Sequence, residues 1–314
     1  MTSRTRREFL QACSGVAAAA FATSVLCAAA TEADPARRPI GIQLYSVRQA
    51  MASDTPGTLK QLHDIGYREV ETADLGSYSA KDFGRLIKDA SLSCHSAHLE
   101  FDTTDMNVLF ENALAVGATY ATSSELSILG WVPGQTSAPG PGDAPATPAN
   151  SWPGLPIGTD GFKRLASYMN TLGVKAKAAG LQYVYHNHSK EFEKLPDGRL
   201  GYDILINETD PQLVKFEIDC GWMAIGGASP AEYMMKYPSR FRLLHIKDFK
   251  AMPTTPGIRP PGCDLGAGFV QYKSTFAAAK AIGIQHILSE QERPFTEPEM
   301  ESATIDYAYI RSFT

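Results

Sequence analysis

Short apolar runs alternate with longer amphipathic segments along most of this chain. Runs rich in β-branched and aromatic residues are typical of buried strands, whereas apolar residues at every third or fourth position indicate helices. Strand-like runs cover 40–45, 67–71, 92–98, 118–122, 181–185, 213–218, 241–246 and 286–289. Helical patterns cover 55–65, 80–90, 106–116, 162–179, 202–208, 230–237, 272–281 and 298–310. Eight strand–helix units predict a single-domain α/β fold, the (β/α)8 TIM barrel.

A doubly wound open sheet is the main alternative for such an alternation. That fold would place a Gly-rich phosphate-binding turn after the first strand, but residues 44–48 read LYSVR. The barrel is therefore favoured.

Residues 1–30 have the pattern of a twin-arginine signal peptide. Residues 5–10 read TRREFL, and the alanine-rich apolar stretch 12–30 ends in three alanines that suit a cleavage site. A retained membrane anchor and lipidation at Cys27 are the alternatives. We expect a periplasmic protein with no stable membrane insertion after cleavage, and residues 31–314 as its catalytic domain.

One further stretch breaks the alternation, a Pro/Gly-rich insertion at 130–156. Its composition does not support regular structure, so we expect a long loop on the barrel rim. A disordered insertion and a lid over the active site both remain open.

Charge and cysteine content narrow the functional classes. The whole chain has a net charge of −5, and residues 1–30 carry +2 from three Arg and one Glu, so residues 31–314 carry about −7. The sequence contains no Lys/Arg run, so we expect no nucleic-acid partner. Cys94, Cys220 and Cys263 are odd in number and widely spaced, which predicts free thiols.

Three consecutive predicted strands end on side chains that bind metals. Asp219, His245 and Glu290 stand where these strands give way to turns. The carboxyl ends of parallel barrel strands meet at one face, which holds the active site. Each residue alone would more often be a cap or a core histidine, but three in register favour a site. Carboxylate, imidazole and carboxylate ligands suit one divalent ion, Mn²⁺, Co²⁺, Mg²⁺ or Zn²⁺.

The chain resembles the xylose-isomerase-like TIM barrels of the sugar phosphate isomerase/epimerase superfamily. Residues 183–250 carry the resemblance, with YHNH at 185–188, Glu191, DCGW at 219–222 and LHIKD at 244–248. The resemblance implies a four-ligand metal site in which Asp219, His245 and Glu290 match three ligands.

The fourth ligand is a Glu in many relatives, at the end of the fifth strand, where this chain has His186. His186, His188 and Glu191 are the candidates. We favour Glu191, because three carboxylates and one imidazole suit a hard cation better.

Further candidates flank these ligands. His98 and Glu71, at the ends of the third and second strands, are candidate catalytic groups, with core packing as the alternative. Lys247 is a candidate catalytic residue whose pKa a nearby metal could depress, or else part of an exposed turn. Glu217 is expected to pair with Lys215 or Arg242 inside the barrel.

Four residues are candidates for substrate binding, namely His186, His188, Trp222 and Asp248. The indole of Trp222 offers a stacking face for a pyranose and one N–H donor. Epimerase relatives carry a His at this position, which weakens a direct transfer of their activity. The glycine-rich segment 264–268 is expected to form a tight turn.

The resemblance implies proton abstraction next to a carbonyl of a carbohydrate. Our first hypothesis is a metal-dependent isomerase or epimerase of a free sugar or keto-sugar, acting through an enediolate. The second is a lyase or dehydratase that acts by β-elimination on a 3-keto-glycoside or keto-inositol-like substrate. The third is an exported, non-catalytic sugar-binding protein. Relatives are often dimers or tetramers, so a homo-oligomer is expected.

Overall fold

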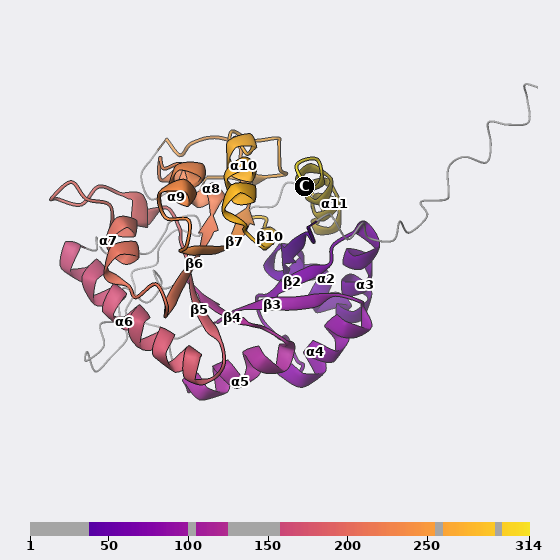
Figure 1. Cartoon of the computed structure of the whole chain (residues 1–314). Helices are drawn as coiled ribbons and strands as arrows, with labels where there is room; N and C mark the ends of the chain where they lie inside the picture. The colour runs from indigo at the N-terminus through magenta and orange to yellow at the C-terminus, as the bar shows by residue number, and fades with distance from the viewer. Residues whose placement is uncertain (1–37, 100–104, 125–157, 255–259, 293–296) are drawn as a thin grey trace, which may run out of the picture. The chain divides into compact units, whose positions relative to one another are not determined.

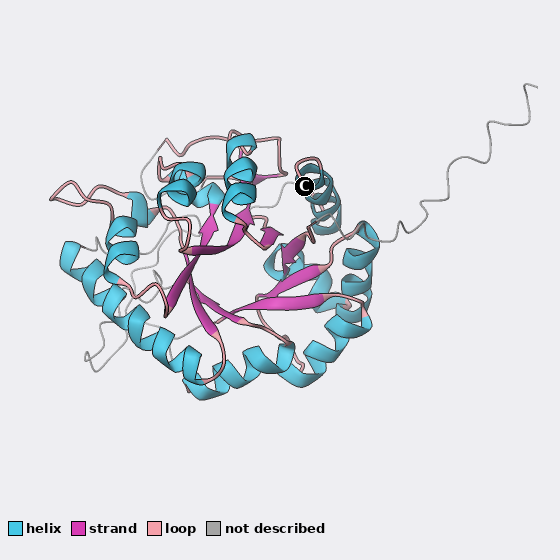
Figure 2. Ribbon diagram, in the orientation of Figure 1, coloured by secondary structure: helices cyan, strands magenta, loops and turns pink. Residues whose placement is uncertain are grey.

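Eight parallel strands close into a barrel in the order β1-β10-β7-β6-β5-β4-β3-β2 (Figures 1 and 2). Their bounds are β1 Gly41–Gln43, β2 Glu69–Thr72, β3 Ser93–His98, β4 Tyr120–Ser123, β5 Gln182–His186, β6 Val214–Asp219, β7 Phe241–Ile246 and β10 His286–Ser289. Every pairing between neighbouring strands is parallel. The predicted single-domain (β/α)8 barrel is confirmed.

The computed structural model describes residues 38–99, 105–124, 158–254, 260–292 and 297–314, and the chain divides into the units Met1–Arg37 and Arg38–Thr314. The predicted signal peptide and the predicted rim loop at 130–156 lie outside the described residues. Both stay predictions. Among the described helices, none has the length and apolar character needed to cross a bilayer.

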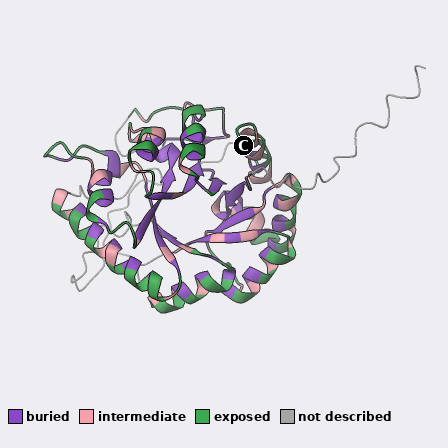
Figure 3. Ribbon diagram, viewed as in Figure 1, coloured by how far each residue is buried: buried purple, intermediate pink, exposed green. Residues whose placement is uncertain are grey.

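Helices surround the barrel and turn their buried faces toward it (Figures 2 and 3). Their bounds are α2 Arg48–Ser53, α3 Thr55–Ile65, α4 Ala80–Asp89, α5 Met106–Val116, α6 Thr159–Ala178, α7 Gly201–Glu208, α8 Cys220–Ile225, α9 Pro230–Lys236, α10 Lys273–Ile282 and α11 Glu299–Arg311. Side-chain caps define several of the starts. Asp54, Ser79 and Ser229 each accept a backbone N–H of the first turn of α3, α4 and α9.

Several short elements could not be predicted from the periodicity of the sequence. These are the 3-10 helices η1 Leu44–Val47 and η3 Lys190–Phe192, the helices α2 and α8, and the antiparallel pair β8 Asp248–Phe249 and β9 Gly262–Cys263. All of them are too short to show a helical or strand repeat. Side-chain hydrogen bonds to the backbone, rather than an apolar pattern, mark some of them.

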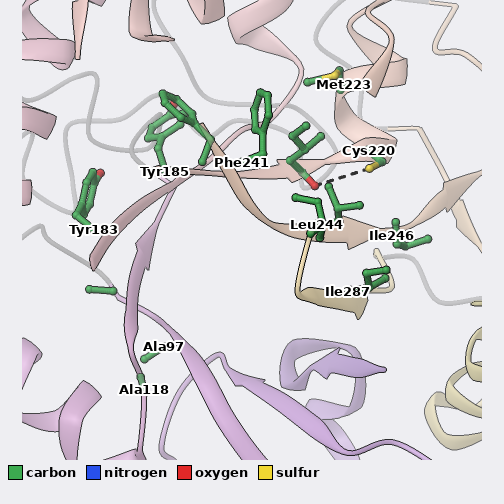
Figure 4. Packing of buried hydrophobic residues seen from close by; sticks show 14 of the residues in the cluster. Ala97, Ala118, Tyr183, Tyr185, Cys220, Met223, Phe241, Leu244, Ile246 and Ile287 are labelled. Atoms are coloured by element: carbon green, nitrogen blue, oxygen red, sulfur yellow. Dashed lines mark hydrogen bonds between the residues drawn. The ribbon is translucent and has the colours of Figure 1, made fainter. Parts of the chain in front are cut away.

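The main hydrophobic core lies between the strands and the helices. Figure 4 shows Leu244 and Ile246 of β7 beside Cys220 and Met223 of α8, with Ile287 of β10 nearby. These outward-facing positions alternate with residues that face the barrel interior.

The interior holds its own small apolar layer. Val184, Leu243 and Leu288 form a separate buried cluster, against which Tyr120 packs. On each of β5 and β7 the polar site residue lies two positions further along the strand, and the same spacing on the β10 segment leads to Glu290. The apolar layer therefore forms a floor beneath the carboxyl ends of the strands.

Candidate active site

Four side chains meet at the carboxyl ends of four neighbouring strands. His186, Asp219, His245 and Glu290 each offer one ligand atom, and these four atoms lie within 4.8 Å of one another. The strand register creates the group, because Asp219 pairs with His245 across β6 and β7, and Glu290 donates its backbone N–H to Ile246. Three members of this group are the ligands predicted from the sequence, and His186 is the fourth member.

Glu191, the favoured fourth ligand in the sequence analysis, lies in a different environment. Its Oε1 accepts the Tyr185 hydroxyl at 2.8 Å and the backbone N–H of His188 at 3.0 Å. Burial raises its pKa to about 7, although these hydrogen bonds favour the anion. Glu191 as ligand stays a prediction, but the geometry favours His186.

Carboxylates behind the two imidazoles orient them. His186 Nδ1 lies 2.8 Å from Glu217 Oε2, while its Nε2 lies 3.5 Å from Asp219 Oδ2. His245 Nε2 lies 2.6 Å from Glu71 Oε2, while its Nδ1 lies 2.7 Å from Glu290 Oε2. A carboxylate on the far nitrogen is the usual support of a metal-binding histidine.

Glu71, a predicted catalytic residue, thus lies behind His245. Its carboxylate also accepts Gln43 Nε2 at 2.9 Å and Ser96 Oγ at 2.5 Å, and the side chain is fully buried. This arrangement assigns it a positioning role.

The predicted pairing of Glu217 with Lys215 or Arg242 is wrong. Glu217 contacts the imidazoles of His186 and His245, the latter at 3.2 Å. Lys215 lies one interior layer closer to the start of β6 and donates to the carbonyl of Ser239 at 3.0 Å. Burial and the charge of a neighbouring carboxylate raise the pKa of Glu217 to about 8.

Lys247 is neither exposed nor shifted toward deprotonation. Its Nζ lies 2.8 Å from Asp219 Oδ2, 2.7 Å from Glu290 Oε2 and 2.8 Å from Glu292 Oε1, and the residue is 1% exposed. Burial opposes the charged ammonium, but the three carboxylates outweigh burial and raise the pKa of Lys247 well above its usual value. In the metal-free protein Lys247 is therefore protonated at neutral pH, and the predicted depression of its pKa by a nearby metal stays a prediction.

His98 presents a free nitrogen to the same region. Its Nε2 is buried and finds no hydrogen-bond partner among the described residues. Its ring centroid lies 5.1 Å from that of His186 and 6.4 Å from that of His245. Burial, more than the charges around it, lowers the pKa of His98, so its imidazole is neutral at pH 7.

Two predicted substrate contacts have partners within the protein. Trp222 is buried, and its Nε1 donates to Glu292 Oε1 at 3.1 Å. Asp248 accepts the backbone N–H groups of four residues, Phe249, Gly266, Gly268 and Val270. Four bonds fill the acceptor capacity of a carboxylate, so Asp248 organises the glycine-rich segment. A Cβ at Gly268 would lie 2.2 Å from Asp248 Oδ1, which explains that glycine.

His188, the remaining predicted contact, lies at the edge of the group. Its Nδ1 is 2.7 Å from Ser124 Oγ, and its ring centroid is 5.7 Å from that of Trp222. Sequence reasoning missed Glu292, whose only signal was a second carboxylate two residues after Glu290.

The charge balance of this region fits a divalent cation. Five carboxylates gather around two cations, Lys247 and His245. Burial raises the pKa of Asp219 to about 6, and its Oδ2 has no aligned hydrogen bond among the described residues. Two imidazole nitrogens and two carboxylate oxygens form a donor set that suits Zn²⁺, Co²⁺ or Mn²⁺.

Comparison with known proteins agrees with this fold. The alignment with inosose dehydratase 2 of Bacillus cereus is 33% identical over 96 residues and covers 28% of this chain and 29% of that relative. A sugar phosphate isomerase/epimerase structure from Parabacteroides distasonis matches with a TM-score of 0.68 and 24% identity, covering 92% of this chain and 98% of the other.

A structure of the protein IOLI with a bound zinc atom matches with a TM-score of 0.59 and 14% identity, covering 88% of this chain and 97% of the other. Because the sequence identities of both structures are below 25%, these matches show a similar fold and nothing more. The model of one family, the xylose isomerase-like TIM barrels, matches residues 59–306. Since that match spans most of the chain, the protein belongs to the xylose isomerase-like TIM barrel family.

Proposed function

We propose that this protein is a metal-dependent lyase that removes a proton next to a carbonyl of an unphosphorylated carbohydrate and expels a β-oxygen substituent. The observation that carries this proposal is geometric: the ring of His98 lies beside those of His186 and His245, and the ammonium of Lys247 contacts Asp219 and Glu290, so both groups flank one donor set. β-Elimination needs such a pair, a base for the C–H proton and an acid for the leaving oxygen.

His186, Asp219, His245 and Glu290 would hold the cation. When bound, a divalent cation polarises a carbonyl oxygen and stabilises the negative charge that develops on it. Glu217 and Glu71 fix the rings of the two histidines, so that each directs one nitrogen into the site. Lys247 shares Asp219 and Glu290 with this position, so its ammonium would lie beside a substrate bound there.

The proton transfers follow from these groups. His98 accepts the C–H proton, the electron pair left on carbon forms a C=C bond, and the C–O bond at the β position breaks. Lys247 gives a proton to the departing oxygen, so that water or an alcohol leaves. Proton exchange with solvent then returns both side chains to their starting states.

Two observations support the choice of substrate class. Three carboxylates already neutralise the charge of Lys247, so this residue would not bind a phosphate group, which favours an unphosphorylated substrate. The aligned part of the inosose dehydratase sequence points to a cyclic keto-polyol, although it spans only 28% of this chain.

The isomerase or epimerase hypothesis is the second candidate. His98 can return the proton that it removes, and Lys247 can supply one from another direction, which is all that epimerisation requires. The two candidates therefore share the first proton transfer and differ in whether a C–O bond breaks.

An isotope experiment separates them. The purified protein, metal-loaded or chelated, is incubated in D₂O with keto-inositols, 3-keto-glycosides and free ketoses, and products are followed by NMR. Metal-dependent release of water or an aglycone with a new enone supports the lyase, whereas deuterium in an intact skeleton supports the epimerase.

Variants test the assigned roles. His98→Asn should lose deuterium exchange and elimination together, while Lys247→Met should keep exchange and lose elimination. His63→Ala, on the outer helix α3, is the matched control and should behave like the wild type. Elimination that survives chelation, or that survives in His98→Asn, would contradict the proposal.

A further inference from the structure

A second group of potential metal ligands lies at the amino-terminal end of the barrel. Glu69, His95 and His286 each offer one ligand atom, and these atoms lie within 4.8 Å of one another. His286 Nδ1 lies 2.9 Å from Glu69 Oε2, and His95 Nε2 lies 3.8 Å from Glu69 Oε1. The two imidazole rings have centroids 4.8 Å apart.

This group is separate from the candidate active site. Glu69 and His286 are the first residues of β2 and β10, whereas Glu290 follows the last residue of β10. Four residues of strand span about 13 Å at about 3.3 Å each. The apolar layer of Val184, Leu243 and Leu288 lies between the two ends.

A glycine in the closing strand brings the three residues together. β1 lies between β10 and β2, and Gly41 pairs with Leu288 on one side and Glu69 on the other. A Cβ at Gly41 would lie 2.9 Å from Leu288 Cδ2 and 3.1 Å from Glu69 Cβ. Since no side chain stands there, groups from β2 and β10 can meet across β1.

We propose that Glu69, His95 and His286 form a structural site for a divalent transition metal of the Zn²⁺ class, which ties β2 and β3 to β10 across the closing strand. Two imidazoles and one carboxylate are a known zinc donor set that leaves a fourth position for water. Zinc–nitrogen bonds of about 2.0–2.1 Å place tetrahedral ligands roughly 3.3 Å apart, close to the present spacing.

Burial and the types of donor atom at this end favour one class of metal. Glu69 and His286 are buried, while the His95 side chain is 40% exposed and gives an ion a route to the site. Burial lowers the pKa of His95, which favours the neutral imidazole that binds metal. Two of the three donors are imidazoles, so the site favours a cation that gains from nitrogen ligands. Zn²⁺ meets this condition and Mg²⁺ does not.

The position suggests a contribution to stability rather than chemistry. Reactions in this fold occur at the opposite face, whereas the amino-terminal face supports the fold. A metal here would link the first strands of the barrel to its last strand, where the sheet closes.

Metal counting tests the site independently of the proposed function. The full-length protein is chelated, loaded with Zn²⁺, desalted and analysed for zinc per chain, and its melting temperature is recorded with and without Zn²⁺. We expect two zinc ions in the wild type, one each in His95→Ala and Asp219→Ala, and none in the double variant.

The melting temperature of Asp219→Ala should rise with Zn²⁺, and that of the double variant should not. His63→Ala is the matched control, and it should retain both ions. Because His95 is partly exposed, its removal should leave the barrel folded, which circular dichroism checks.

One zinc ion in the wild type that Asp219→Ala abolishes would overturn this inference and leave the active-site metal intact. Two ions in His95→Ala and in His286→Ala would also overturn it. In either case Glu69 and the histidines would form a hydrogen-bonded cluster only.

Discussion

Replacing Lys247 by Met removes a buried ammonium from among three carboxylates and keeps the length of the side chain. Each of the three ion pairs spans 2.7–2.8 Å. At an effective dielectric constant of about 20, one such pair is worth about 6 kcal/mol before desolvation. Desolvation offsets most of that sum, and breaking a buried pair typically costs about 3–5 kcal/mol.

Lys247→Met should lower the stability of the protein only when the site lacks a divalent cation. At roughly 2–4 °C per kcal/mol for a domain of this size, the chelated variant should melt on the order of 10 °C below the chelated wild type. A divalent cation supplies the missing positive charge, so metal should raise the melting temperature of the variant more than that of the wild type.

Differential scanning calorimetry of both proteins, with chelator and with Mn²⁺ or Zn²⁺, measures the effect. Lys236→Met is the matched control, because this exposed lysine of α9 pairs with a single carboxylate among the described residues, that of Asp203. Equal melting temperatures of the chelated wild type and Lys247→Met would refute the reasoning. So would a smaller stabilisation of the variant by metal.

Four further predictions rest on the contacts of the site. Glu71→Gln should lower metal affinity by about 10–100-fold in a chelator competition, since it disturbs the support of a ligand, and an unchanged affinity would remove its positioning role. His186→Ala should lose the metal and Glu191→Gln should keep it. Between pH 4.5 and 7 the wild type should lose about 3 kcal/mol more stability than Glu191→Gln in urea unfolding, because the pKa of Glu191 is raised from 4.5 to about 7. The acid limb of kcat/KM should lie below pH 6.5, because burial lowers the pKa of His98, and a limb above 6.5 would exclude it as the base.

The barrel was predictable because each strand and helix is marked by its own apolar pattern and end signals, and this pattern repeats along the chain. Helix α3, for example, follows the capping residue Asp54 and ends before Gly66, so capping and periodicity give the same bounds. The convergence of Asp219, His245 and Glu290 was predictable for a related reason, since each ends or directly follows an apolar run. Parallel strands bring such ends together without any knowledge of the loops.

Strand register and contacts between residues far apart in the sequence could not be predicted from local patterns. The pairing of β6 with β7 shifts register between Phe216 and Glu217, and no sequence pattern marks that irregularity. The environment of Lys247 depends on Glu290 and Glu292, some 45 residues away, so the sign of its pKa shift could not be read locally.

The fourth ligand depended on a choice between neighbours in sequence. A 3-10 turn folds Glu191 back onto Tyr185 and the His188 backbone, whereas His186 ends its strand inside the barrel. Donor chemistry alone favoured the carboxylate, and geometry favours the imidazole.

Anomalous X-ray scattering from metal-loaded crystals, recorded at the absorption edge of Mn or Zn, tests the central claim most directly. We predict a peak at the carboxyl ends of the strands, within about 2.0–2.3 Å of one atom each of His186, Asp219, His245 and Glu290. The peak should be missing in Asp219→Ala crystals. A peak coordinated by Glu191 in place of His186 would contradict the ligand set, and no peak at this end of the barrel would contradict the metal-dependent mechanism.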